Sequence, residues 1–169
     1  MSFENKLNKQ YNKIANYVSD MIPGPWEKVN LVAYMEEYAS EVFFFFTVPQ
    51  KDELYYSQHI PKDFGVSKKE YVNRAFRLCD LFDDLNAIFV KYGQEQFGTC
   101  EFDFTIEGNL NVSFEYIDWK ASNFSPSEKF DYYRYKKFGI LPKLDYELKE
   151  LYALERYMKE YQKQQDTSI

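Results

Sequence analysis

The sequence has 169 residues, of which 20% are aromatic, and it carries a formal net charge of −6. Its length fits one domain with a sizeable core, and its charge argues against free nucleic acid as a partner, because phosphate binding needs a positive surface. No apolar run approaches the roughly 18 residues of a membrane span, and the polar, charged N-terminus does not resemble a signal peptide, so we expect a cytoplasmic protein.

The first predicted element is a helix over residues 2–21. Ser2 can cap its N-terminus, and apolar residues follow at spacings of three and four. Pro23-Gly24-Pro25 ends the helix. Alternation then predicts a strand over 26–35, with one apolar face made by Val29, Leu31, Ala33 and Met35.

A second strand is predicted over 41–48, and a short third strand over 54–57. The second contains four consecutive phenylalanines, Phe43 to Phe46. Such a run is apolar on both faces, so we expect both sides of this strand to be covered.

The second long helix has a clear start at Ser67. Ser67 and Glu70 have the spacing of a capping box, and Tyr92-Gly93 supplies a stop. Between them runs one apolar stripe, made by Tyr71, Ala75, Leu78, Phe82, Leu85 and Phe89.

Residues 100–119, CEFDFTIEGNLNVSFEYIDW, predict a β-hairpin by their alternation. A three-residue loop, 107–109, would make the apolar faces of the two strands coincide. This register pairs Ile106 with Leu110, Phe104 with Val112, Phe102 with Phe114, and Cys100 with Tyr116.

Two helical segments close the chain, over 127–138 and from Leu144 to about Gln164, and we expect residues 165–169 to be disordered. The element order is α-β-β-(β)-α-β-β-α-α. Strands joined this tightly are antiparallel, so the fold class is α+β, with an antiparallel sheet of about five strands packed against helices in one domain over 1–169.

The predicted register makes Glu101 and Glu115 cross-strand neighbours, with Asp103 beside them. From Thr99 to Asp118 there are five acidic residues and no Lys or Arg, so nothing inside the segment relieves the repulsion. Three interpretations remain open: a solvated outer face, an acidic patch that receives Lys and Arg from a partner, or a divalent-metal site.

The segment that follows is basic and rich in tyrosine. Residues 119–141 contain five basic and two acidic residues, and a protein contact suits them better than nucleic acid does in so acidic a chain. Candidate aromatic anchors are Trp119, Tyr132, Tyr133 and Tyr135, although Trp119 equally suits a core. Catalysis is not indicated, because His59 is the only histidine and the two cysteines lack metal-ligand spacing.

Several strings resemble the YezG/EsaG family of immunity proteins. They are the hairpin quoted above, YYRYKKFGILP at 132–142, KLNKQYNKIANYVSDMIPGPWEKV at 6–29, and EVFFFFT at 41–47. The resemblance covers about residues 3–154. It implies a single YezG-like domain that acts as the antitoxin of a nuclease toxin exported by type VII secretion, with no catalytic residues, metal or cofactor of its own.

A nuclease carries a basic cleft, which an acidic, Tyr-rich surface can occupy. We therefore predict partner contacts for Glu101, Asp103, Glu115 and Asp118 by charge, and for Trp119, Tyr132, Tyr133 and Tyr135 as anchors. Two alternatives are a metal-dependent hydrolase using the Glu101, Asp103 and Glu115 carboxylates, and a non-catalytic scaffold protein.

Overall fold

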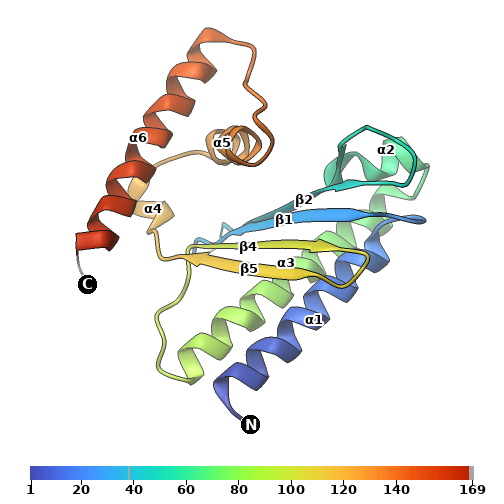
Figure 1. Ribbon diagram of the computed structural model, residues 1–169, viewed down its shortest axis with the longest axis horizontal. Coiled ribbons are helices and arrows are strands. Elements are labelled where there is room, and N and C mark those ends of the chain that lie inside the picture. The colour runs from blue at the N-terminus through green and yellow to red at the C-terminus, as the bar shows by residue number, and fades with distance from the viewer. Residues whose placement is uncertain (38, 168–169) are drawn as a thin grey trace. The chain divides into compact units, whose positions relative to one another are not determined.

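A five-stranded antiparallel sheet organises the N-terminal part of the chain (Figure 1). The structure is a computed structural model, which describes residues 1–37 and 39–167. It divides into two compact units, Met1–Tyr116 and Ile117–Ile169. That residues 1–169 form a single domain stays a prediction.

The strands are β1 (Lys28–Tyr34), β2 (Glu41–Thr47), β3 (Tyr55–Tyr56), β4 (Thr99–Thr105) and β5 (Leu110–Glu115). Their spatial order is β3-β2-β1-β4-β5, and every neighbouring pair is antiparallel. β1 is therefore the central strand, hydrogen-bonded to β2 on one side and to β4 on the other. The predicted α+β class and five-stranded sheet are confirmed.

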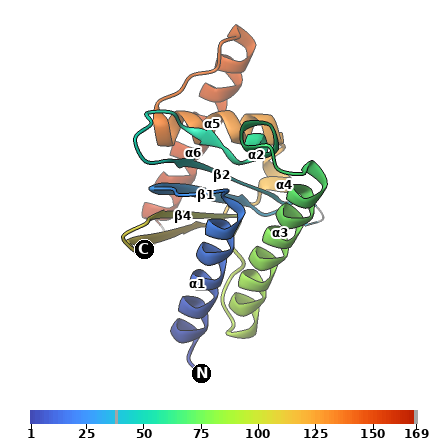
Figure 2. The ribbon, with the colours of Figure 1, turned by 90° about the vertical axis from the view of Figure 1, so that its right-hand side faces the viewer.

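Two long helices, α1 (Phe3–Met21) and α3 (Lys68–Lys91), lie side by side on one face of the sheet (Figures 1 and 2). Both begin where the sequence predicts. The Ser2 hydroxyl accepts a hydrogen bond from the Asn5 amide, and the Ser67 hydroxyl accepts one from the Glu70 amide. Each cap satisfies an N–H group that the first helical turn leaves without a partner.

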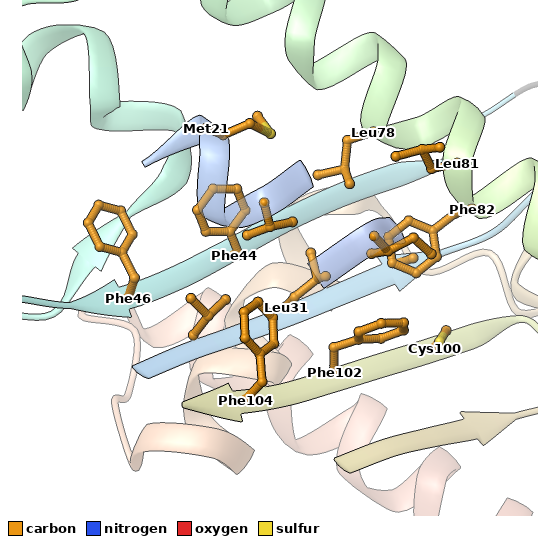
Figure 3. Packing of buried hydrophobic residues seen from close by; sticks show 14 of the residues in the cluster. Met21, Leu31, Phe44, Phe46, Leu78, Leu81, Phe82, Cys100, Phe102 and Phe104 are labelled. Atoms are coloured by element: carbon orange, nitrogen blue, oxygen red, sulfur yellow. The ribbon is translucent and has the colours of Figure 1, made fainter. Parts of the chain in front are cut away.

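The core lies between these helices and the sheet. Leu31, Phe44, Phe102 and Phe104 point from three strands toward Leu78 and other residues of the helices (Figure 3). The predicted apolar stripe of α3 faces this core: Tyr71, Leu78, Phe82, Leu85 and Phe89 are buried and Ala75 is partly buried.

The four phenylalanines of β2 are all buried, as the sequence predicts. Phe44 and Phe46 belong to the helix-covered core. Phe43 and Phe45 alternate with them, and their rings contact Tyr56 with centroid distances of 6.2 Å and 5.1 Å. The strand therefore buries both faces, which explains a continuous apolar run where an alternating pattern would otherwise be expected.

The sequence did not predict the elements that link β3 to α3. These are a 3-10 turn, Ser57–His59, and α2, Ile60–Phe64. Pro61 stands in the first turn of α2, and Gly65 ends it with a φ of 66°, a left-handed conformation that favours glycine. A helix this short has no apolar periodicity that a sequence pattern can reveal.

The C-terminal unit consists of α4 (Trp119–Ser122), α5 (Pro126–Phe138) and α6 (Asp145–Thr167). α5 starts with a complete capping box between Ser125 and Glu128, one residue earlier than the sequence predicts. α6 continues to Thr167, so 165–167, predicted to be disordered, are helical. Residues 168–169 lie outside the described part of the chain.

Within the described residues, no helix combines the length and apolar character that crossing a bilayer requires.

Candidate partner-binding site

The hairpin that carries the predicted acidic residues forms in a different register. Phe104 pairs with Leu110, Phe102 with Val112, and Cys100 with Phe114. The loop between β4 and β5 therefore comprises residues 106–109, and the predicted three-residue loop, 107–109, is wrong. Gly108 adopts a φ of +97° in this loop, and its amide donates to the Thr105 carbonyl at 3.0 Å.

The observed register has a physical cause at Ile106. Its amide donates a 2.9 Å hydrogen bond to the Glu27 carbonyl, which extends the β1–β4 pairing, and its side chain is 57% exposed. The prediction assumed that Ile106 lies on the buried face. Because a shift of two residues leaves every side chain on the same face, hydrophobic alternation alone cannot separate the two registers.

This register separates the predicted carboxylate pair. Ser113 lies opposite Glu101, and Thr99 lies opposite Glu115. The arrangement behind the metal-dependent alternative, with Glu101 and Glu115 directly opposed, is therefore not formed. Among the described residues, no group of three or more His, Cys, Asp or Glu side chains could hold a metal ion.

Glu101, Asp103 and Glu115 are half-buried and alternate with the core residues of their strands. Asp103 lies opposite Asn30 of β1, whose Nδ2 donates a hydrogen bond of 2.6 Å to Asp103 Oδ1. Asn30 is only 3% exposed, so this contact satisfies a buried amide. Asn30 was not among the predicted residues, because its only signal in the sequence is a polar side chain within a largely apolar strand.

The remaining predicted residues belong to the C-terminal unit. Asp118 is exposed, and its Oδ1 accepts a hydrogen bond from the Ala121 amide, which caps α4. Trp119 is 1% exposed, with Lys129 Nζ 5.4 Å from its ring centroid. Trp119 is therefore a core residue of the structure, one of the two roles that the sequence allowed.

The three tyrosines of α5 differ in exposure. Tyr133 is buried, with Lys137 Nζ 6.0 Å from its ring centroid, whereas Tyr132 and Tyr135 are half-buried. Glu155 of α6 accepts a hydrogen bond from the Tyr135 hydroxyl and raises the pKa of that group. Part of the surface of Tyr132 and of Tyr135 is therefore accessible, whereas the side chain of Tyr133 packs in the interior.

The two cysteines, Cys79 and Cys100, are free thiols. Burial raises the pKa of Cys79, and burial raises the pKa of Cys100 well above its usual range. Both thiols are therefore protonated at neutral pH, whereas the thiolate is the reactive form.

The sequence model described as "Immunity protein YezG-like" matches residues 7–152, across both units. The chain belongs to this family of immunity proteins, which are not enzymes. The predicted family is thereby confirmed.

Three relatives are similar to the chain over most of its length. The type VII secretion system protein EsaG of Staphylococcus aureus is 46% identical over 160 residues, which cover 95% of this chain and 98% of EsaG. The immunity protein YezG of Bacillus spizizenii is 33% identical over 82% of this chain and 86% of its own length. YezG of Bacillus subtilis is 29% identical over 78% and 87%.

Proposed function

We propose that this immunity protein is the antitoxin of a nuclease toxin exported by type VII secretion, and that it binds the nuclease domain in the cytoplasm of the producing cell. The observation that carries the proposal is the similarity to EsaG, named as a type VII secretion system protein, over nearly the full length of both chains. Membership of an immunity protein family supports the binding of a cognate toxin.

The charge of the chain suits such a partner. A nuclease must carry positive charge where it holds the phosphate backbone, and this chain has a net charge of −6. In the N-terminal unit the proposed contacts are Glu101, Asp103 and Glu115. In the C-terminal unit they are Asp118, Tyr132 and Tyr135. The buried side chains of Trp119 and Tyr133 support these contacts by packing below them.

Co-expression with the toxin encoded beside its gene tests the function directly. Cells that produce the toxin should survive only when this chain is present, and the tagged chain should retain the nuclease domain on an affinity resin. A toxin that is neither retained nor silenced would refute the proposal. A second, non-cognate immunity protein of the same family serves as the control for specificity.

Stopped-flow mixing tests whether the carboxylates steer association. Electrostatic steering weakens as salt screens exposed charge, so the wild-type association rate should fall between low and physiological ionic strength. Glu101→Lys should slow association at low salt and flatten this dependence, whereas Glu53→Lys, at an exposed loop position, should change neither. Circular dichroism confirms that both variants are folded. A salt-independent wild-type rate would contradict the steering role.

A further inference from the structure

Helix α3 carries a second apolar stripe, on the side that does not face the core. Its members are Val72, Phe76, Ala87 and Val90, all exposed. Phe76 is 67% exposed, Val90 53% and Val72 38%. The core-facing stripe occupies the opposite side of the same helix, and α1 packs along the helix (Figure 2). Folding therefore leaves this outer stripe in contact with water.

The spacing of the stripe is that of a helix-binding surface. Val72, Phe76, Cys79, Asp83, Ala87 and Val90 follow one another at intervals of four, three, four, four and three residues. Such intervals keep residues on one side of a helix. The stripe extends for about 27 Å at the helical rise of 1.5 Å per residue, which matches several turns of a partner helix.

Acidic residues interrupt the stripe at its middle. Asp83 lies within it, and Asp80 and Asp84 lie beside it. Burial, together with the like charges of Asp80 and Asp84, raises the pKa of Asp83. Arg77 forms an exposed ion pair with Asp80 at 4.0 Å, and Arg74 donates a hydrogen bond to the Asp20 carbonyl.

We propose that this outer stripe of α3 binds a basic amphipathic helix of the toxin, with Phe76 as the apolar anchor and Asp83 facing a Lys or Arg side chain. The proposal rests on the proposed function for the identity of the partner. An exposed aromatic side chain on the same side of a helix as a carboxylate can join an apolar anchor to complementary charge. The helical spacing favours a helix laid along the stripe.

Charge separates this occupant from a second copy of the chain. Two copies that packed through the same stripe about a two-fold axis near its middle would bring Asp83 of one copy close to Asp83 of the other. Like charges at an interface oppose association. The same acidic residues favour a partner that brings positive charge.

Binding of the catalytically inactivated nuclease domain, measured by calorimetry, tests the proposal. Phe76→Ser and Asp83→Lys should each weaken the Kd by roughly tenfold or more, as expected of an anchor and of a charge reversal. The matched controls are Tyr146→Ser, at an aromatic residue 60% exposed on α6, and Asp52→Lys, at an exposed loop position. Both controls should stay within about twofold of the wild type. Unfolding curves for all four variants separate lost binding from lost fold.

The outcomes are distinct. If the wild type binds the nuclease domain and both α3 variants bind equally well, the toxin does not use this stripe and the inference is wrong, while the proposed function stands. If the wild type does not bind the nuclease domain, both this inference and the proposed function are wrong. Light scattering of the chain alone supplies the remaining outcome: a dimer that Phe76→Ser dissociates would make the occupant a second copy and overturn the inference.

Discussion

Asn30 and Asp103 face each other across β1 and β4, and the Asn30 side-chain amide donates a 2.6 Å hydrogen bond to the Asp103 carboxylate. The contact links the central strand to the strand that carries two of the proposed partner-binding carboxylates. It fixes the orientation of Asp103, because a hydrogen bond to a charged group is stronger than one between neutral groups.

Asn30→Ala should lower the free energy of unfolding by about 1–3 kcal/mol, because it removes the donor from a half-buried carboxylate. Urea denaturation measures the change. Asn111 also lies opposite Asp103, on β5, but it is exposed. Asn111→Ala should therefore stay within about 0.5 kcal/mol of the wild type, and equal losses in both variants would contradict the structural role of Asn30.

Phe82 and Phe76 give a matched pair on one helix. Phe82 is fully buried, whereas Phe76 is 67% exposed. Phe82→Ala should cost about 3–5 kcal/mol in thermal or urea unfolding, and Phe76→Ala should cost less than about 0.5 kcal/mol. A large loss for Phe76→Ala would show that the outer side of α3 supports the fold of the chain itself.

Disulfide trapping tests the hairpin register. Directly opposed residues have Cα atoms about 4.5–5.5 Å apart, within the range that a disulfide spans, whereas diagonal neighbours lie about 7–8 Å apart. With Cys79 replaced by Ser, Glu101→Cys with Ser113→Cys should oxidise readily, because these positions are opposed. Glu101→Cys with Glu115→Cys should not. The reverse result would restore the three-residue loop.

Tyr71 predicts how stability responds to alkaline pH. Burial raises the pKa of its hydroxyl to about 12, so between pH 10 and 12 the folded state holds a proton that the unfolded state releases. The contribution is complete below the unfolded pKa and is lost as the pH rises through the folded one. Tyr71→Phe should therefore make the decline of stability over this window shallower. Denaturation curves at several pH values measure the free energy of unfolding. If its dependence on pH is the same in Tyr71→Phe as in the wild type, the raised pKa of Tyr71 is contradicted.

Local patterns predicted most of the fold because each long element has a physical mark in the sequence. Ser2 and Ser67 mark helix starts, and the stripe from Tyr71 to Phe89 marks the buried side of α3. The run Phe43 to Phe46 marks a strand buried on both faces. Short elements such as α2 and α4 escaped because one turn of helix shows no periodicity.

The site was less predictable, because it depends on partners across strands. The two-residue register error arose because alternation fixes which face a side chain occupies but not which residue lies opposite. The burial of Trp119 and Tyr133 follows from packing in the C-terminal unit. Their aromatic character alone does not predict whether they are buried or exposed. Phe76 was not predicted as a contact residue, because a single aromatic residue outside the core-facing stripe does not alter the helical pattern.

Titration of the active toxin nuclease with this chain tests the central claim most directly. Residual cleavage of a fluorescent DNA substrate is measured as the chain is added to a fixed amount of nuclease. A binding antitoxin predicts a linear fall to complete inhibition at about one equivalent, with no cleavage by the chain alone. Full nuclease activity in the presence of a large excess of the folded chain would contradict the claim.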